Sequence, residues 1–280
     1  MPKPEAGAAP WLVPDWPAPP GVHAVFTTRS GGVSAPPFDS CNLGDHVRDE
    51  PAAVAANRAR LAQALGVRPV FLQQVHGTEV LELKPDTPDG AVADACLGTQ
   101  PGVACTVMVA DCLPVLFAHR SGRVVAAAHA GWRGLAGTGT GGAPSAVGVL
   151  ETTLQALVRA LGGESDGSSA AQVAADTVVW LGPCIGPAAF EVGTEVRDAF
   201  VATLPDAAQA FQAQPSGQLM ANLPLLARQR LAAMGIRQLH GNDGSAPWCT
   251  VSDPGRFFSH RRDAARLGST GRMAACIWRD

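Results

Sequence analysis

Residues 102–130 constrain the fold more than any other part of this sequence. Two apolar runs rich in β-branched residues, "GVACTVMVADCLPVLFAH" and "VVAAAHA", are joined only by the polar turn "RSGR". Runs of this length and composition predict buried strands. Pro114 lies inside the first run, and because proline lacks the N–H that a sheet needs, we expect a strand end or an irregular loop near it.

The remaining elements are also predicted to be strands that occur in pairs, with a small number of helices around them. Further strands are expected at 22–28, within 68–83 on both sides of the "HG" turn, and within 176–186. The segment 249–280 is expected to form a short strand, an Arg-rich loop and a last strand. Helices are expected within 49–66, 145–163, 193–204 and 223–235. Because strands do not alternate strictly with helices, the pattern predicts an α+β fold with mixed or antiparallel sheets flanked by helices.

The sequence predicts an N-terminal tail followed by one domain. Residues 1–20 are rich in proline and lack an apolar stretch of signal-peptide length, which predicts a flexible proline-rich tail and a cytoplasmic protein. No internal repeat or linker divides the rest, so we expect a single catalytic domain over 21–280. Two glycine-rich stretches, 137–146 and 163–172, are expected to be solvent loops.

Charge and cysteine usage exclude several classes of protein. The formal net charge of -3 provides no basic field for nucleic acid or for an anionic membrane. The longest apolar stretch, 102–118, contains Asp111 and is shorter than the roughly 20 residues of a membrane span. Seven scattered cysteines are typical of buried thiols rather than of a disulfide framework.

Three short motifs each place a metal-binding side chain at the end of an apolar run. They are "QQVHG" with His76, "VADCLP" with Cys112 and "AAAHAGWRG" with His129. Two imidazoles and one thiolate suit Zn²⁺, and three protein ligands leave the open position that a catalytic zinc needs. The ligands are far apart in sequence, unlike those of a zinc finger, so isolated core histidines and a buried thiol are an open alternative.

Four arginines lie at turns where a guanidinium could hold a phosphate or a carboxylate. Arg29 follows the first predicted strand, Arg133 follows Trp132, and Arg261 and Arg262 belong to "FFSHRR". The alternative for each is a solvated surface arginine. Arg29 and Arg133 are the phosphate-binding candidates.

Two carboxylates and one cysteine add candidates for catalysis. Asp94 and Asp111 stand at strand ends, where each could act as an acid, a base or an orienting partner of a ligating histidine, or simply cap a turn. In a second hypothesis Cys112 is a nucleophile and His129 its base. That hypothesis leaves His76 unexplained.

Taken together, these segments resemble the YfiH-like "laccase-domain" family. The matching segments run in the family's order: "TTRSGGVS", "NLGDHVRDE", "NRARL", "QQVHG", "ADCLPVL", "HAGWRGL", "LGPCIGPAAFEVG", "RFFSHRRD" and "GRMAACIW". The resemblance implies that His76, Cys112 and His129 are zinc ligands. It also implies one α+β domain like that of the cytotoxic necrotizing factor deamidases, whose catalytic Cys and His keep the cysteine-hydrolase hypothesis open.

The chain departs from the family pattern in its C-terminal third and in one insertion. Asn222 replaces an acid before a predicted helix, His260 replaces the aromatic residue of an "FFSYRR" motif, and the glycine-rich insertion after "HAGWRGL" is long. These departures affect substrate contacts and leave the three ligands unchanged.

The resemblance implies a purine nucleoside phosphorylase that also deaminates adenosine. Its expected substrates are adenosine, inosine and methylthioadenosine together with inorganic phosphate, and its expected cofactor is zinc, with copper as the alternative. The residue pattern argues against other classes: there is no H-x-H pair typical of multicopper oxidases, so polyphenol oxidase activity would be secondary. There is also no H-x-E motif typical of nucleobase deaminases. A structural zinc with Cys184 as fourth ligand would instead favour a non-enzymatic binding protein.

Overall fold

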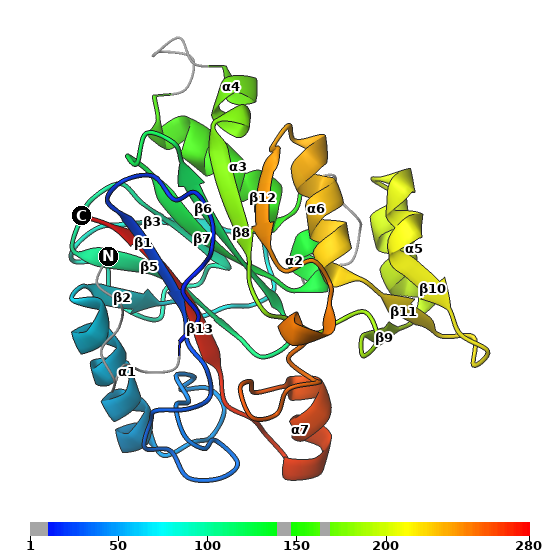
Figure 1. Ribbon diagram of the computed structural model, residues 1–280, viewed down its shortest axis with the longest axis horizontal. Coiled ribbons are helices and arrows are strands. Elements are labelled where there is room, and N and C mark those ends of the chain that lie inside the picture. The colour runs from blue at the N-terminus through cyan, green and yellow to red at the C-terminus, as the bar shows by residue number, and fades with distance from the viewer. Residues whose placement is uncertain (1–10, 139–146, 163–168) are drawn as a thin grey trace.

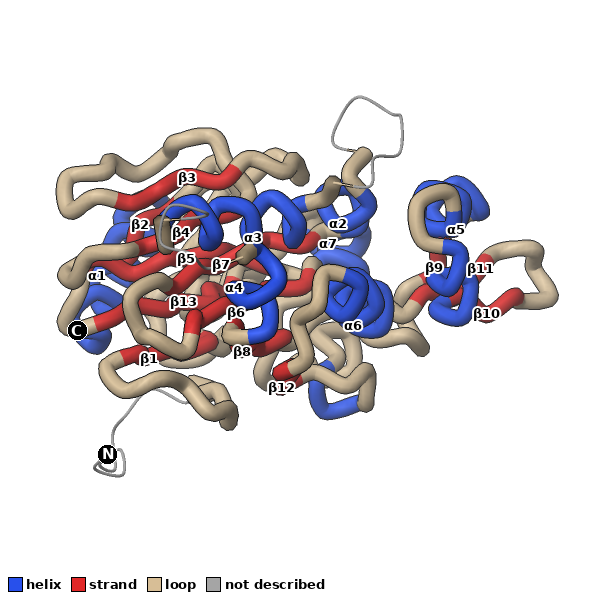
Figure 2. The backbone as a smooth tube through the Cα atoms, turned by 90° about the horizontal axis from the view of Figure 1, so that it is seen from above, coloured by secondary structure: helices blue, strands red, loops and turns tan. Residues whose placement is uncertain are grey.

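Two β-sheets pack face to face, and helices cover their outer faces (Figures 1 and 2). The computed structural model describes residues 11–138, 147–162 and 169–280. One hydrophobic cluster fills the space between the sheets, and one lies between each sheet and its helices. This arrangement confirms the expected α+β class.

The larger sheet has six strands and is mixed. Its order is β12 (Gln238–Gly241), β8 (Thr177–Leu181), β6 (Leu113–His119), β7 (Val125–Ala130), β4 (Ala95–Gly98) and β3 (Val80–Leu83). The outer pairs β12–β8 and β3–β4 are parallel, whereas the three central pairings are antiparallel. The short turn between β6 and β7 makes the hairpin that the sequence of 102–130 predicts.

The smaller sheet has four strands and pairs the first strand of the chain with the last one. Its order is β1 (Val22–Phe26), β13 (Met273–Arg279), β5 (Val103–Val109) and β2 (Arg68–Phe71). The pairs β1–β13 and β13–β5 are antiparallel, and β2–β5 is parallel. The strands β5 and β6, which follow each other in sequence, therefore belong to opposite sheets.

Alternation along the strands decides which side chains face which layer. In β7, Ala126, Ala128 and Ala130 pack toward the helices, whereas Val125 and Ala127 pack between the sheets. His129 has the same parity as Val125 and Ala127. The strand therefore directs this imidazole to the side of the inter-sheet layer, at the end of β7.

The helices pack on the outer faces through apolar side chains. The helices α3 (Val149–Ala160) and α6 (Leu223–Ala233) contribute to the cluster over the six-stranded sheet, together with α2 (Trp132–Ala136) and α4 (Ala170–Ala175). The helix α1 (Pro51–Leu65) covers the smaller sheet. At one end, α5 (Thr194–Val201) packs beside a separate three-stranded antiparallel sheet. Its order is β10 (Phe211–Ala213), β11 (Leu219–Ala221) and β9 (Glu191–Val192). The helix α7 (His260–Leu267) lies below the larger sheet in Figure 1.

The break expected near Pro114 is confirmed, because the chain crosses between the sheets at residues 110–112 and Pro114 is the second residue of β6, close to the strand start where proline is tolerated. Two other local predictions about strands and loops are wrong. The Arg-rich segment expected as a loop forms α7, because the Ser259 side chain caps it by accepting a bond from the Arg262 N–H. The short strand expected near residue 249 is only an isolated bridge between Cys184 and Cys249.

Residues 11–20 differ from the flexible tail expected for 1–20. Leu12 and Phe26 exchange two backbone hydrogen bonds of 2.9 and 2.8 Å, and Trp16 and Ala18 pack against the inter-sheet cluster. Residues 1–10 lie outside the described residues, as do 139–146 and 163–168 of the two glycine-rich stretches. Among the described helices, none combines the length and hydropathy that a membrane span requires.

Asn57 on α1 is a buried amide that organises the loop between β1 and α1. Its Nδ2 donates to Ser34 Oγ, to the Ser40 carbonyl and to the Asn42 carbonyl at 3.0, 3.2 and 2.9 Å. Its Oδ1 accepts from the Val33 N–H at 2.9 Å. The loop that precedes α1 is thus tied to the helix by one side chain.

We predict that Asn57→Ala lowers the free energy of unfolding by about 2–4 kcal/mol, because it leaves buried backbone groups unpaired. Denaturant unfolding followed by circular dichroism measures the change. The exposed Gln63→Ala on the same helix is the matched control and is expected to change stability by less than about 0.5 kcal/mol. Equal effects of the two substitutions would contradict the assigned role of Asn57.

Candidate metal centre and its pocket

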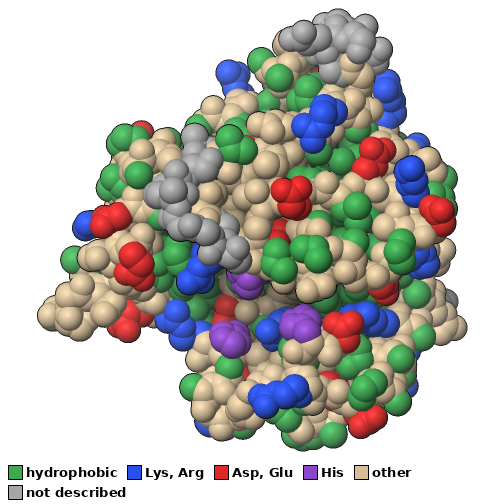
Figure 3. Space-filling view, turned by 180° about the vertical axis from the view of Figure 1, so that it is seen from behind, with side chains coloured by type: hydrophobic (Ala, Val, Ile, Leu, Met, Phe, Trp, Pro, Cys, Tyr) green, Lys and Arg blue, Asp and Glu red, His purple; other side chains and the backbone are tan. Residues whose placement is uncertain are grey.

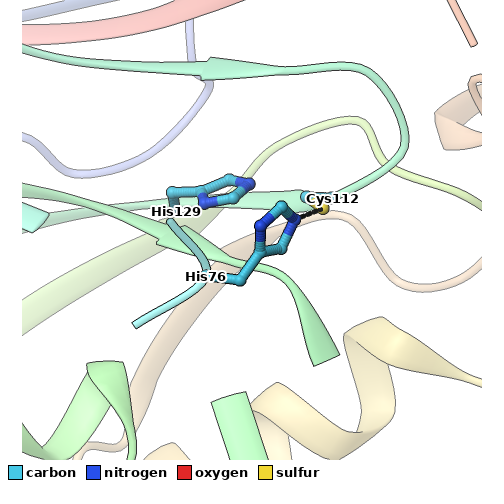
Figure 4. A group of neighbouring side chains, drawn as sticks. All are labelled: His76, Cys112 and His129. Carbon is cyan, nitrogen blue, oxygen red and sulfur yellow. Dashed lines mark hydrogen bonds between the residues drawn. The ribbon is translucent and has the colours of Figure 1, made fainter. Parts of the chain in front are cut away.

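The structure brings His76, Cys112 and His129 together from three separate segments (Figure 4). His76 lies between β2 and β3, Cys112 between β5 and β6, and His129 near the end of β7. Their ligand atoms all lie within 4.8 Å of one another, and Cys112 Sγ is 3.6 Å from His76 Nε2. The two imidazole rings meet edge to face with centroids 4.8 Å apart.

Asp94 orients two of the three side chains. Its fully buried carboxylate accepts a 2.8 Å bond from His129 Nδ1, which leaves Nε2 of that ring free to bind a metal. The same carboxylate accepts the N–H groups of Val75, His76 and Gly77 at 3.1, 2.9 and 2.6 Å. One side chain therefore fixes the His129 ring and the backbone that carries His76.

Two residues of the site have left-handed backbones although neither is glycine. His76 has φ of 61° and Asp111 has φ of 87°. Such values are uncommon outside glycine and persist only when the surroundings hold them. For His76 the surroundings are the Asp94 carboxylate, which binds three consecutive N–H groups.

The Asp111 carboxylate ties the Cys112 segment to the C-terminal part of the chain. Oδ1 accepts from Thr250 Oγ1 at 2.6 Å, and Oδ2 accepts from Ser259 Oγ at 3.1 Å and from the Arg261 N–H at 2.6 Å. These bonds anchor the start of α7 beside the crossing that holds Cys112. Asp111 thus lines the pocket with both carboxylate oxygens already bonded.

Two glycines of "HAGWRG" allow close contact with the His76 segment. A Cβ on Gly131 would lie 2.6 Å from His76 Cδ2 and 3.2 Å from Cys112 Sγ. A Cβ on Gly134 would lie 2.6 Å from the Gly77 carbonyl oxygen. Since Cβ atoms do not approach this closely, both positions require glycine for the ligands to meet.

The three groups also shift one another's protonation. Burial raises the pKa of the Cys112 thiol, but the adjacent His129 and His76 outweigh it and lower this pKa to about 6. Burial lowers the pKa of His129, whereas Cys112 and Asp94 raise it to about 9. Burial raises the pKa of Asp94, and hydrogen bonds from His129 and from backbone N–H groups bring it below its usual value. The thiolate, which is the form that binds metals, is thus favoured at neutral pH.

The three side chains line one pocket of about 340 Å³. The rest of its lining combines apolar and aromatic side chains with basic ones. Figure 3 shows histidine and basic side chains gathered along the hollow that divides this face of the molecule. The apolar and aromatic lining comprises Met108, Val109, Ala110, Trp132, Ile185, Phe190 and Leu223, and the polar lining beyond the ligands comprises His46, Gln74, Asp111, His260, Arg261 and Arg272.

The two phosphate-binding candidates lie outside this pocket. Arg29 donates to the carbonyls of Asp39 and Pro254, both at 2.9 Å, and pairs with the Asp39 carboxylate at 3.1 Å. Arg133 is exposed, and its guanidinium stacks on Trp132, 4.4 Å from the ring centroid. Neither guanidinium lines the wall that holds the three ligands. Arg29 is held by structural bonds because its turn packs on the segment before α7.

The prediction of a fourth ligand at Cys184 does not match the structure. Its buried Sγ donates to the Ile185 carbonyl and accepts from Asn242 Nδ2, both at 3.4 Å. Within the described ranges, the only group of three or more potential metal ligands that lie together is His76, Cys112 and His129. Two imidazoles and one thiolate suit a divalent transition metal and leave a position open to the pocket.

Sequence reasoning missed three polar residues of the pocket. His46 and Arg272 belong to "NLGDHVRDE" and "GRMAACIW", segments that matched the family pattern without suggesting a role, and Gln74 lies two residues before His76. The imidazole of His46 and the guanidinium of Arg272 are types that bind anions, but they stand far apart in sequence. Only the fold places them in one wall.

Comparisons with known proteins agree with the folded chain over nearly its whole length. The family model described as "Multi-copper polyphenol oxidoreductase laccase" matches residues 23–280. A protein of Pseudomonas aeruginosa named purine nucleoside phosphorylase is 52% identical over 270 residues, covering 96% of this chain and 98% of that protein. The purine nucleoside phosphorylase YfiH of Escherichia coli is 47% identical over 269 residues, covering 95% and 98%.

A solved structure shares the architecture. The crystal structure of a Neisseria meningitidis protein superposes with a TM-score of 0.82 at 42% identity, covering 96% of this chain and 99% of that chain. The agreement extends across both sheets and the segments between them.

We predict that Asp94→Asn lowers metal affinity about 10–100-fold, because the amide cannot accept all the bonds that orient His129 and the His76 segment. Competition with a chromophoric chelator measures the affinity. The exposed Asp86→Asn is the control and is expected to keep wild-type affinity. Unchanged binding in Asp94→Asn would contradict the orienting role.

We predict that Gly131→Ala also weakens metal binding, by about tenfold or more, because its methyl group displaces the His76 ring and the Cys112 sulfur. Metal content after dialysis against buffered zinc measures the loss. Gly255→Ala, where the nearest atom to a new Cβ is 3.5 Å away, is the matched control. A fully loaded Gly131→Ala protein would show that the close contact is dispensable.

Proposed function

The chain belongs to the multi-copper polyphenol oxidoreductase laccase family, which includes the YfiH-like proteins, and from this premise we propose that it is a zinc-dependent purine nucleoside phosphorylase with adenosine deaminase activity. The observation that carries the proposal is the meeting of His76, Cys112 and His129 in the wall of one pocket. The names of the relatives support the phosphorylase activity.

The pocket suits a nucleoside in size and lining. Its volume of about 340 Å³ falls in the range of about 300–1,000 Å³ that small-molecule sites occupy. Trp132 and Phe190 offer aromatic faces on which a purine can stack, and Ile185 and Leu223 extend the apolar wall. Adenosine, inosine and methylthioadenosine are the proposed substrates, with inorganic phosphate as co-substrate.

In the proposed phosphorolysis, a phosphate oxygen bonds to C1′ of the ribose as the C1′–N9 bond breaks. The bonding electron pair leaves with the purine, which takes up a proton, and the products are ribose 1-phosphate and the free base. In the proposed deamination, water adds at C6 of adenine and the amino group leaves as ammonia, giving inosine. A zinc ion held by the three ligands would supply a Lewis acid at the pocket wall.

In this proposal the carboxylates of Asp94 and Asp111 position the residues that would bind the metal. Asp94 is fully buried and accepts bonds from one ring and three backbone N–H groups. Asp111 holds the Cys112 segment through both of its oxygens. We therefore assign both to orienting the ligands, in place of the acid role that the sequence suggested for them.

One observation favours a second candidate, a cysteine amidohydrolase. Cys112, His129 and Asp94 follow one another in the order nucleophile, base and orienting acid, with His129 Nδ1 bonded to Asp94 at 2.8 Å. This arrangement gives His76 no role, although His76 Nε2 lies 3.6 Å from the sulfur. The metal site uses all three side chains and is preferred for that reason.

A multicopper oxidase would need more metal ligands than this site provides. Across the described residues, one three-ligand group is the only such cluster, so a site for several copper ions has no donors there. A single copper ion is the alternative occupant, because the affinity of nitrogen and sulfur donors rises toward copper. Elemental analysis of the purified protein distinguishes zinc from copper.

We predict that His76→Ala removes bound zinc and lowers inosine phosphorolysis at least about 100-fold, because one of three ligands is lost. Zinc content and chromatographic quantification of hypoxanthine measure the two effects. His119→Ala, at an imidazole outside the pocket, is the control and is expected to keep both. A His76→Ala protein with full activity and no zinc would contradict the proposal.

Chelation of the wild-type protein separates the two candidate functions. Under the zinc hypothesis, removal of the metal abolishes phosphorolysis and added zinc restores it. Under the cysteine-hydrolase hypothesis, activity survives chelation and is lost when the Cys112 thiol is alkylated.

A further inference from the structure

The pocket contains a group of basic side chains that the metal ligands do not use. His46, His260, Arg261 and Arg272 all line it. Among the described residues, Asp111 is the only carboxylate in the same lining, and its two oxygens are already bonded by Thr250, Ser259 and the Arg261 N–H. We call these four side chains the basic wall of the pocket, and they are suited to an anion.

Arg272 is held beside the metal ligands by a buried amide. Asn42 Oδ1 accepts from the Arg272 N–H at 2.8 Å and from the Gly44 N–H at 2.9 Å. Asn42 thus joins the start of β13 to the loop that carries His46. Arg272 packs over Gly44, since a Cβ there would lie 2.7 Å from Arg272 Cγ.

Within the described residues, the guanidinium of Arg272 uses only Nη1 for hydrogen bonds to the protein, so its other donors can bind a ligand. Nη1 donates to the carbonyls of Thr270 and Gly271 at 3.0 and 3.2 Å, and within the described part of the chain no carboxylate lies within 4.0 Å of this guanidinium. Burial lowers the pKa of Arg272, whereas the negative charges of Cys112 and Asp111 raise it. Arg272, Cys112 and Asp111 line the same pocket.

Arg261, on α7, is oriented by its own set of contacts. Its Nη1 donates to the Glu191 carbonyl at 3.0 Å, and its guanidinium lies 5.8 Å from the centroid of the Phe190 ring. The backbone N–H of Arg261 bonds Asp111 at 2.6 Å. Arg261 thus comes from α7 and Arg272 from the residue before β13, and both line the same cavity.

We propose that the basic wall is the binding site of the co-substrate phosphate, with Arg272 as its principal ligand and Arg261, His46 and His260 as further donors. A guanidinium presents paired N–H donors that match phosphate oxygens, and histidine N–H groups add single donors. This inference rests on the proposed phosphorylase function and replaces Arg29 and Arg133 as the phosphate ligands. Because deamination consumes water and no phosphate, the basic wall serves phosphorolysis selectively.

The test compares two reactions of the zinc-loaded protein. Arg272→Gln is expected to raise the KM for inorganic phosphate in inosine phosphorolysis by about tenfold or more and to leave adenosine deamination within about twofold of wild type. Arg261→Gln, at an exposed position, is expected to give a smaller increase with the same selectivity. Arg123→Gln, on the β6–β7 turn, is the control and keeps both reactions.

A direct binding measurement keeps this test separate from the proposed function. Inorganic phosphate titrated into the zinc-loaded wild-type protein is expected to give saturable binding by calorimetry that Arg272→Gln weakens by about tenfold or more. Phosphate binding that Arg272→Gln and Arg261→Gln leave unchanged would overturn the site, as would equal loss of deamination and phosphorolysis. Phosphate binding that depends on Arg272 in a wild-type protein without phosphorolysis would contradict the proposed function and retain the site.

Discussion

The site depends above all on one buried carboxylate. Asp94 accepts the His129 ring N–H and three consecutive backbone N–H groups around His76, so it fixes two ligands that come from different segments. A carboxylate without exposure to water is stable only with such partners, because burial of an unpaired charge is costly. The need to satisfy Asp94 thus orders the His76 segment in a left-handed conformation that it would not otherwise hold.

The ligands stand where the chain passes between the two sheets. The segment from β2 to β3 carries His76, and the segment from β5 to β6 carries Cys112. Both crossings contain a non-glycine residue with positive φ, held by carboxylate hydrogen bonds. His129, by contrast, lies on a regular strand. The site therefore combines two irregular segments, held by carboxylate hydrogen bonds, with one regular strand, and Gly131 and Gly134 supply the space in which they meet.

The same pocket holds groups suited to two reactions. In the proposed function, the group of His76, Cys112 and His129, with its aromatic neighbours Trp132 and Phe190, would hold and activate the purine nucleoside. The basic wall around Arg272 matters only when an anion takes part. The two features come from different parts of the chain, so substitutions can separate them, and the cysteine-hydrolase alternative would use neither His76 nor the basic wall.

Most strands of the two main sheets, four of the helices and the candidate metal-binding residues His76, Cys112 and His129 could be predicted from the sequence, because apolar runs, helical spacing and His or Cys at strand ends are local signals. The strands β4 and β12 of the larger sheet were not predicted. The break near Pro114 was predicted correctly, whereas the helix α7 was predicted to be a loop, because the serine cap at Ser259 was not recognised. The sequence suggested Arg29 as a phosphate-binding candidate and gave no role to Arg272, yet Arg29 is bonded to Asp39 and Pro254, whereas Arg272 lines the pocket. Residue type and spacing determined which side chains could do chemistry. Only the tertiary structure decided which of them share a cavity, because that depends on contacts between segments distant in the chain.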